Sequence, residues 1–430
     1  MTSLNLATLA DERLSPHDKG LPARAIGLTV AEFLALDPRL GEFWTPLIVL
    51  DDAAMQSNLD VMAEWTTTRG LELMPHGKTT MAPALWQRQL DAGCTGITLA
   101  TMGQVRTARS FGLDSIMLAN SAVDPRALRF LATELADPDV RFSCWVDSVE
   151  TIDAIERALE NVSLPRRIDV LVELGQDGGR TGARTIDEAI TVARRAAASG
   201  VVRLAGVGGY EGSLGHDRSA HSVDAVRRYL ERQVELHTAL GDLYDDGDIT
   251  VTAGGSAYFD IVADVYAGAM RGDERTHWTL RSGAYITHDD GFYRGISPLD
   301  EAGTDVANPL RSAMRGVARV VSHPEPGLAL IDGGKRDFPF DEGLPIPRSI
   351  ARDIGQEWRS LEGASISAMN DQHSYLALPH EGSETPDAAI GDVVSLGLSH
   401  PCTAFDKWHY LPVVESADSD RVIALVRTFF

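Results

Sequence analysis

The sequence predicts an α/β protein in which a (β/α)8 TIM-type barrel is followed by a C-terminal β domain. Two observations support the barrel. From Leu71 onward, short apolar or β-branched runs alternate with longer amphipathic stretches, as in repeated strand–helix units around a parallel sheet. The number of such runs is close to eight, which favours a closed barrel over the alternative, an open doubly wound sheet.

The predicted barrel strands are separated by helices along most of this region. Strands are expected at 71–74, 96–101, 115–119, 141–146, 168–174, 202–210, 249–253 and 278–286. Helices are expected at 52–67, 125–136, 149–160, 185–199, 222–243 and 258–267. The active site of such a barrel lies at the C-terminal ends of its strands.

After residue 286 the pattern changes to short strands joined by loops rich in proline, glycine and acidic residues. These strands are expected at 313–321, 328–331, 365–369, 393–398, 409–414 and 422–428, with an N-terminal strand at 46–50 joining them. We therefore expect a barrel over residues 51–290 and a β domain made of residues 1–50 and 291–430.

The composition excludes several classes of partner. A formal net charge of −23 and a pI near 4.9 would repel nucleic acid and anionic lipid. The three cysteines, Cys94, Cys144 and Cys402, are far apart and indicate no disulfide framework, so a reducing cytoplasm is expected. Residues 1–20 lack the basic start and apolar stretch of a signal peptide, and no segment approaches the roughly 18 apolar residues of a membrane helix.

Lys78 is the strongest candidate for a catalytic residue. It follows the first predicted barrel strand, after His76 and Gly77, and precedes an alanine-rich segment of helical character. A partly desolvated lysine at a strand end is suited to forming a Schiff base with a carbonyl cofactor. A lysine taken at random is more often a solvated surface residue, so the remaining motifs decide between the two interpretations.

Further candidates follow other strands. Gly254, Gly255 and Ser256 come after the seventh strand, where barrels often bind a phosphate, although the same sequence is equally an ordinary turn with an N-cap serine. Arg180 lies among glycines after the fifth strand and can meet an anionic cofactor oxygen or pair with Asp177. Tyr210 and Tyr285 can wall a planar ring, although buried tyrosines are more often packing residues.

A possible metal motif lies in the β domain. In an extended segment, residues two apart face the same way, so His400 and Cys402 can present an imidazole and a thiolate to one zinc ion. Two ligands suit an open site rather than a closed structural one, and the spacing also arises by chance. Asp371 and His373 can face the same cavity or form an ordinary hydrogen-bonded pair.

Together these motifs resemble those of fold-type III pyridoxal phosphate enzymes, specifically the D-serine dehydratase-like group with D-threonine aldolases and D-3-hydroxyaspartate dehydratases. The resemblance covers most of the chain from about Pro46 and implies an alanine racemase-like barrel. It rests on residues 75–79, the glycine-rich turn with Arg180, residues 254–256 and, above all, the pair His400 and Cys402.

The resemblance also implies roles for these residues. Lys78 would carry pyridoxal 5'-phosphate and remove the α proton of the substrate. Two positions would bind Zn²⁺ or another divalent metal, namely His400 and Cys402. The remaining positions would contact the cofactor, namely His76, Arg180, Tyr210, Gly254, Gly255, Ser256 and Tyr285. A homodimer is expected by analogy.

The expected activity is dehydration of a D-3-hydroxy amino acid such as D-serine or D-threonine to a 2-oxo acid and ammonia. Dehydratases of the group typically have His-x-Cys where the aldolases have His-x-Asp, so Cys402 favours dehydration over retro-aldol cleavage. A non-catalytic cofactor carrier or a racemase would have no use for a metal pair. The run Asp371–Gln372–His373 departs from the Glu-Glu-His of relatives, which leaves the preferred substrate side chain open.

Overall fold

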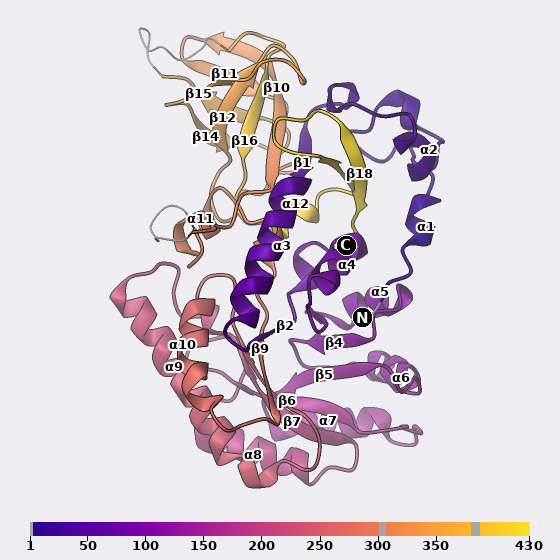
Figure 1. Ribbon diagram of the computed structural model, residues 1–430, viewed down its shortest axis with the longest axis vertical. Coiled ribbons are helices and arrows are strands. Elements are labelled where there is room, and N and C mark those ends of the chain that lie inside the picture. Colours follow the sequence, from indigo (N-terminus) through magenta and orange to yellow (C-terminus); the bar gives the residue numbers. More distant parts are fainter. Residues whose placement is uncertain (1–2, 301–306, 380–387) are drawn as a thin grey trace.

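The computed structural model describes residues 3–300, 307–379 and 388–430. It has two lobes (Figure 1): one is built from a parallel sheet surrounded by helices, and the other from antiparallel strands. The long helix α3 (Asp52–Thr67) runs from the second lobe to the first. It begins directly after strand β1 (Leu47–Asp51), and the Asp51 carboxylate caps it by accepting a hydrogen bond from the amide of Ala54 at 2.9 Å.

The parallel sheet has eight strands in the order β2-β9-β8-β7-β6-β5-β4-β3. A bridge between His76 and Thr98 joins the two ends, together with hydrogen bonds from Thr98 N to Pro75 O (2.9 Å) and from Thr95 N to Leu73 O (3.0 Å). The sheet is therefore closed, which confirms the barrel and excludes the open sheet. Its strands are β2 (Glu72–Leu73), β3 (Ile97–Leu99), β4 (Ser115–Leu118), β5 (Arg141–Val146), β6 (Ile168–Leu174), β7 (Val202–Gly209), β8 (Ile249–Ala253) and β9 (Thr276–Leu280).

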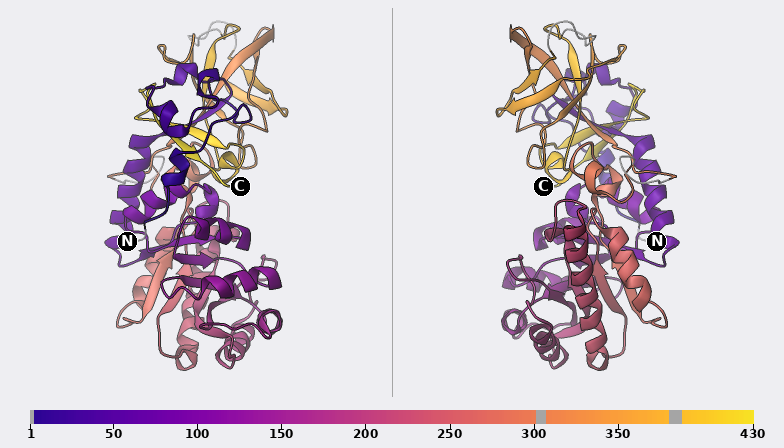
Figure 2. Two further views of the ribbon diagram at one scale, coloured as in Figure 1. Left: turned by 90° about the vertical axis from the view of Figure 1, so that its right-hand side faces the viewer. Right: turned by 90° about the vertical axis from the view of Figure 1, so that its left-hand side faces the viewer.

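Helices lie along the outside of the barrel strands (Figures 1 and 2). Several begin at capping residues that the sequence places just before them; Thr185, for example, forms a reciprocal capping box with Glu188. The helices of this lobe are α4 (Pro83–Asp91), α5 (Met102–Ser110), α6 (Pro125–Glu134), α7 (Val149–Leu159), α8 (Ile186–Ala197), α9 (Ala220–Ala239), α10 (Phe259–Ala269) and α11 (Phe292–Ile296).

The second lobe is a sheet in the order β13-β12-β16-β10-β1-β17-β18, with β11, β15 and β14 branching from β10. Strand β1 pairs antiparallel with β10 and parallel with β17, so the N-terminal strand does lie among the C-terminal ones. The sequence did not indicate β12, β13 or β15. The strands are β10 (Met314–Glu325), β11 (Leu328–Ile331), β12 (Ile346–Ala351), β13 (Arg359–Ser360), β14 (Ser365–Met369), β15 (Ser374–Ala377), β16 (Val393–Gly397), β17 (Tyr410–Val414) and β18 (Val422–Arg427).

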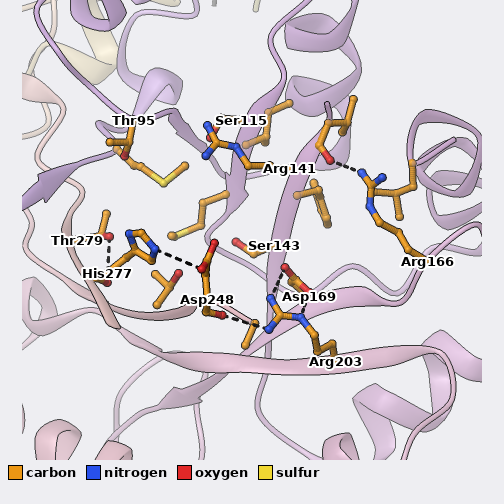
Figure 3. Close-up of a pocket in the computed structure, with 18 of the residues that line it drawn as sticks. Thr95, Ser115, Arg141, Ser143, Arg166, Asp169, Arg203, Asp248, His277 and Thr279 are labelled. Atoms are coloured by element: carbon orange, nitrogen blue, oxygen red, sulfur yellow. Dashed lines mark hydrogen bonds and ion pairs between the residues drawn. The ribbon is translucent and has the colours of Figure 1, made fainter. Parts of the chain in front are cut away.

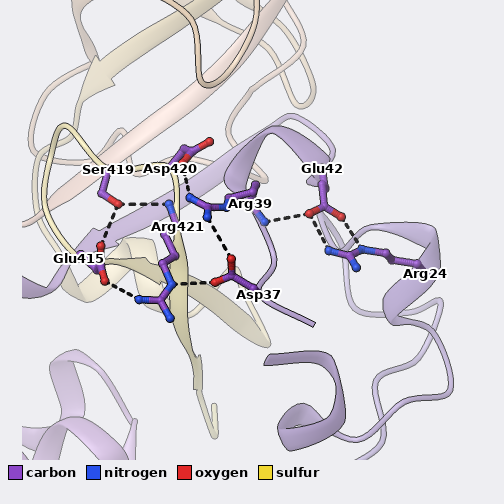
Figure 4. A network of polar contacts seen from close by, with 8 residues as sticks. All are labelled: Arg24, Asp37, Arg39, Glu42, Glu415, Ser419, Asp420 and Arg421. Carbon is purple, nitrogen blue, oxygen red and sulfur yellow. Dashed lines mark hydrogen bonds and ion pairs between the residues drawn. The ribbon is translucent and has the colours of Figure 1, made fainter. Parts of the chain in front are cut away.

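The N-terminal segment, with α1 (Ala7–Ala10) and α2 (Val30–Leu34), packs on this second sheet. Phe33 and Phe43 meet edge to face at 6.0 Å within a buried apolar cluster that includes residues of β1 and β17. At the surface, Arg421 pairs with Asp37 at 2.7 Å and Arg39 with Asp420 at 3.1 Å (Figure 4). Exposed pairs contribute little each, so the apolar cluster holds the segment and the ion pairs orient it.

Several predicted elements extend past the observed ones, and for the last barrel strand this affects the site. Strand β9 ends at Leu280, not at residue 286, and a short 3₁₀ turn follows at Ala284–Ile286. The division into residues 51–290 and the remainder stays a proposal. Within the described parts of the chain, no helix is both long and apolar enough to cross a membrane.

Candidate active site

A pocket of about 290 Å³ lies where the C-terminal ends of the barrel strands face the β domain; we call it the C-terminal pocket. Each of the eight strands contributes a residue at or just after its end, and three further residues come from the following segments. From β2 to β9 these include Lys78, Ala100, Asn120, Trp145, Arg180, Tyr210, Ser256 and Arg281, and from beyond the barrel Tyr293, His400 and Cys402.

Lys78 sits on a rigid turn. The 3₁₀ turn Gly77–Thr79 follows β2, and the indole of Trp86 donates a hydrogen bond to the Gly77 carbonyl at 3.1 Å. A Cβ at Gly77 would lie 2.5 Å from Ile97 Cγ2 and 2.7 Å from Trp86 Nε1, so a larger residue here would displace these side chains. Among the described residues, the Lys78 ammonium has no hydrogen bond or ion pair. Its nitrogen is therefore available to a ligand in the pocket.

His76 begins the same turn and lines the pocket. Burial lowers the pKa of its imidazole well below the usual value, and the positive charges of Lys78, Arg281 and Arg180 lower it further. The ring is therefore neutral at physiological pH. Its Nδ1 is shielded from solvent and has no partner among the described residues.

Two arginines lie against aromatic rings in the pocket. The Arg180 guanidinium stacks 4.8 Å from the Tyr210 ring centre. It forms no ion pair with Asp177, the partner that one of the two sequence interpretations gave it. Arg281 is almost fully buried, 4.9 Å from the Trp145 ring, and donates to Thr252 Oγ1 (2.6 Å) and the Gly209 carbonyl (2.5 Å). Burial raises the pKa of Tyr210 to about 12, so its hydroxyl stays protonated.

The pocket has unsatisfied polar atoms suited to a planar polar cofactor. Three buried nitrogens from its lining have no hydrogen-bond partner within the described residues, namely His76 Nδ1, Trp145 Nε1 and Arg281 Nε. Unpaired buried polar groups are costly, and a bound ligand commonly satisfies them. With the free lysine amine beside them, these atoms fit a group such as pyridoxal phosphate.

The structure differs from the prediction at the expected phosphate-binding residues. The amides of Gly254 and Gly255 donate to the carboxylate of Glu211 at 2.9 and 2.7 Å, so neither is free for a phosphate. Gly255 still lines the pocket, whereas Gly254 does not. The backbone amides of Ser256 and Gly283 donate no hydrogen bond to any described residue. They follow β8 and β9, the two strands whose loops commonly bind phosphate in barrels.

His400 reaches the pocket from the loop before α12 (Cys402–Phe405), and Cys402 from the first residue of that helix. The segment is not extended as the sequence suggested, because His400 has a φ of 51° and Pro401 a helical conformation. Asp341 Oδ2 lies 2.6 Å from His400 Nδ1 and leaves Nε2 for the pocket side, while its Oδ1 accepts a hydrogen bond from Thr403. Cys402 Sγ lies 3.3 Å from Thr79 Oγ1, next to Lys78 in the chain. The candidate metal ligand Cys402 and the turn that carries Lys78 are thus in contact.

The two side chains form a polarised pair. Burial alone would lower the pKa of His400, but Cys402 and Asp341 outweigh it and raise that pKa to about 9. Burial alone would raise the pKa of Cys402, but its hydrogen bond with His400 outweighs it and lowers that pKa. A thiolate beside an imidazole matches the donor preference of zinc. In the described part of the chain, no further His, Cys, Asp or Glu completes a three-residue cluster.

Besides Gly254, the structure leaves Tyr285, Asp371 and His373 outside the pocket lining. Tyr285 is buried beneath it, with its hydroxyl 3.8 Å from Cys94 Sγ, because the chain leaves the strand alternation after Leu280. Asp371 and His373 lie at the exposed turn between β14 and β15, where Asp371 pairs with Arg336 at 3.4 Å. A shared cavity with His400 is therefore wrong for this chain.

Sequence reasoning missed Arg281, Trp145, Glu211 and Asp341. Arg281 was missed because the last barrel strand was predicted to continue to residue 286, which placed Arg281 inside the strand. With the observed strand end it is a charged residue just after an apolar strand, the same kind of signal that identified Lys78. Asp341 gave no local signal, since it is far in sequence from the histidine it contacts.

Comparison with known proteins agrees with this geometry. The family described as a putative serine dehydratase domain matches residues 313–414. A D-threonine aldolase from Arthrobacter sp is 28% identical over 374 residues, covering 86% of this chain and 89% of its own length. A D-threo-3-hydroxyaspartate dehydratase from Delftia sp. is 25% identical, covering 83% of this chain and 90% of its own length. The resemblance to the D-serine dehydratase-like group is confirmed.

Solved structures show the same fold. A D-threonine aldolase from Filomicrobium marinum superposes with a TM-score of 0.74 at 24% identity, covering 90% of this chain and 96% of its own. An alanine racemase-like protein from Idiomarina loihiensis superposes with a TM-score of 0.71 at 16% identity, covering 91% and 98%. The alanine racemase-like barrel expected for the D-serine dehydratase-like group is thus present in this chain.

Proposed function

We propose that this protein is a pyridoxal phosphate- and metal-dependent dehydratase that converts a D-3-hydroxy amino acid, such as D-serine or D-threonine, to a 2-oxo acid and ammonia. The observation that carries the proposal is that Lys78 lines one pocket together with His400 and Cys402. A lysine alone would serve many reactions of such a cofactor. A metal pair beside it supplies a reason to expel a hydroxyl group.

Each bound group would supply one part of the chemistry. Pyridoxal phosphate withdraws electrons from the α carbon of an amino acid joined to it, and a divalent cation acts as a Lewis acid toward a leaving hydroxyl. Of the chain's own residues, Lys78 would hold the cofactor and take the α proton. His400 and Cys402 would hold the cation, with Asp341 fixing the imidazole orientation.

The remaining pocket residues would position the cofactor. Arg180 offers a positive charge held against Tyr210, suited to an anionic ring oxygen. The amides of Ser256 and Gly283 would meet the phosphate. His76 Nδ1 and Arg281 Nε, which have no partner among the described residues, would form hydrogen bonds with the cofactor. Because His76 is neutral, it would not bring an extra proton close to Lys78.

One property of a relative supports the dehydratase over the other candidates. The D-threo-3-hydroxyaspartate dehydratase has been solved as variants in which a histidine, or a cysteine two positions later, is replaced by alanine, and the cysteine variant is described as the metal-free form. The same spacing separates His400 from Cys402. In contrast, the aldolase matched over 86% of the chain favours retro-aldol cleavage as the second candidate.

The test uses the purified protein with pyridoxal phosphate and zinc. We expect Lys78→Ala to abolish the absorbance band of the bound cofactor and all ammonia release from D-serine. Cys402→Ala should keep the band but lose most activity, as should treatment of the wild type with a chelator. The matched control is Cys94→Ala, which alters a cysteine outside the pocket. Full activity in Cys402→Ala would remove the metal from the mechanism.

A further inference from the structure

A second cavity of about 560 Å³ lies at the opposite, N-terminal end of the barrel (Figure 3); we call it the N-terminal cavity. It is separated from the C-terminal pocket by an apolar layer inside the barrel formed by Met117, Trp145, Leu171 and Ala205. The proposed function uses no residue of this cavity. It is almost twice the volume of the C-terminal pocket.

Strand alternation explains which side chains enter the cavity. On β5, Arg141, Ser143 and Trp145 are two residues apart and face the barrel interior, with Trp145 reaching the C-terminal pocket and the other two the N-terminal cavity. Barrel interiors are usually filled by large branched apolar residues. Here serine and threonine stand at several of these positions, including Ser115 and Ser143, and leave space.

The charges around the cavity are only partly balanced. Arg203 pairs with both oxygens of Asp169 at 2.6 and 2.7 Å, and His277 Nδ1 lies 2.5 Å from Glu72. Arg141 has no such partner: over residues 3–300, 307–379 and 388–430, its guanidinium forms no ion pair or hydrogen bond. Its exposed side chain stands at the rim, on the Ser115 side of the cavity in Figure 3.

Hydroxyl groups without partners lie near this arginine. The side-chain oxygens of Ser115 and Ser143 form no hydrogen bond to another described residue. Thr95 Oγ1 is buried and likewise has no partner in the described structure. Figure 3 shows Ser115 beside Arg141, with Ser143 deeper in the cavity. One free guanidinium and three free hydroxyls thus converge on a single space in a protein of net charge −23.

We propose that the N-terminal cavity binds a small organic acid, with its carboxylate on Arg141 and the hydroxyls of Ser115 and Ser143. The planar guanidinium fork matches a carboxylate in two parallel hydrogen bonds, and hydroxyl groups donate to the same oxygens. Asp169 balances Arg203, and His277 lies between Glu72 at 2.5 Å and Asp248 at 3.8 Å. Asp169 and Asp248 lie on the side of the cavity away from Arg141 (Figure 3). The site is independent of the proposed dehydratase chemistry.

Calorimetric titration of the cofactor-loaded protein with succinate tests the site. We expect saturable binding that Arg141→Gln weakens at least tenfold and that Ser143→Val also weakens. Succinamide, a neutral molecule of similar shape, should not bind. Because Arg141 is exposed and unpaired, its substitution should leave the thermal unfolding midpoint unchanged. Arg126→Gln is the matched control, since Arg126 is also exposed but pairs with Asp124 on the outer surface.

Arg180→Gln distinguishes the two cavities. If succinate binds at the N-terminal cavity, this substitution in the C-terminal pocket leaves the affinity unchanged. The proposal is overturned if succinate does not bind, if Arg141→Gln binds it as tightly as the wild type, or if Arg180→Gln is the variant that abolishes binding.

Discussion

Gly283 follows β9 and packs against His76, which begins the turn that carries Lys78. Replacing Gly283 therefore tests how rigidly Lys78 is held. A Cβ built on Gly283 would lie 2.5 Å from the His76 carbonyl oxygen and 2.8 Å from both His76 N and His76 Cβ. Comfortable separations between such atoms are about 3.5 Å, so Gly283→Ala requires a displacement of about 1 Å. None of the three contacted atoms can move by rotating a side chain.

The displacement has two calculable consequences. Overpacking of this kind costs about 1–3 kcal/mol of unfolding free energy. The hydrogen bond from His76 N to Arg281 O, 3.1 Å long, ties the displaced segment to β9, and Lys78 is only two residues further along. A misplacement of about 1 Å in a reacting group can lower the rate about 100-fold. We therefore expect a lower unfolding midpoint together with a kcat about two orders of magnitude below that of the wild type.

The assay is ammonia release from D-serine, with thermal unfolding measured on the same preparations. Gly268→Ala is the control, because a Cβ at Gly268 in α10 would meet nothing within 4 Å and alanine is the better helix former. We expect the control to keep full activity and equal or slightly higher stability. Wild-type kcat and unfolding midpoint in Gly283→Ala would refute the packing argument.

Three further predictions concern stability and metal binding. Burial raises the pKa of Glu173 from 4.5 to about 6, so the folded state holds this proton more tightly than the unfolded chain does. About 2 kcal/mol of unfolding free energy, present below pH 4.5, should therefore be lost as the pH rises through 6. The substitution Glu173→Gln should flatten that part of the plot of stability against pH. Tyr229→Phe removes a buried hydroxyl that donates to the Leu174 carbonyl at 2.6 Å, and should cost about 1–3 kcal/mol in chemical denaturation. Asp341→Asn should weaken zinc binding about 10- to 100-fold in competition with a chromophoric chelator, because the carboxylate holds the His400 ring.

Each of these predictions has a result that contradicts it. A profile of Glu173→Gln that parallels the wild type between pH 4 and about 7 would mean that this carboxyl is not shifted by burial. Unchanged stability of Tyr229→Phe would mean that its hydroxyl bond is matched by water in the unfolded state. Equal zinc affinity of Asp341→Asn and wild type would mean that the metal does not depend on the His400 orientation.

The barrel could be predicted from the sequence because most of its strands are apolar runs and the segments between them have amphipathic helical patterns. The predicted helix at 52–67 coincides with α3, and the strand at 328–331 with β11. Short strands with polar exposed faces were missed: β12 has the pattern Ile-Pro-Arg-Ser-Ile-Ala, in which proline and two polar residues interrupt the alternation.

The candidate site was predictable where a residue lies in the segment that follows a barrel strand. Lys78, Arg180, Tyr210 and Ser256 were found in this way, and the structure brings them into one pocket. Contacts between distant segments could not be found. Glu211 occupies the amides of Gly254 and Gly255 through a turn 43 residues earlier in the chain, and no local pattern indicates that pairing.

The central claim is that Lys78 and the His400–Cys402 pair together remove a β-hydroxyl group. Incubation of the zinc-loaded, cofactor-loaded protein with D-threonine tests it most directly, with products identified by mass spectrometry. We expect 2-oxobutanoate and ammonia in equal amounts. Glycine with acetaldehyde would contradict dehydration and establish the retro-aldol reaction, and the absence of both product pairs from D-threonine and from D-serine would contradict the claim altogether.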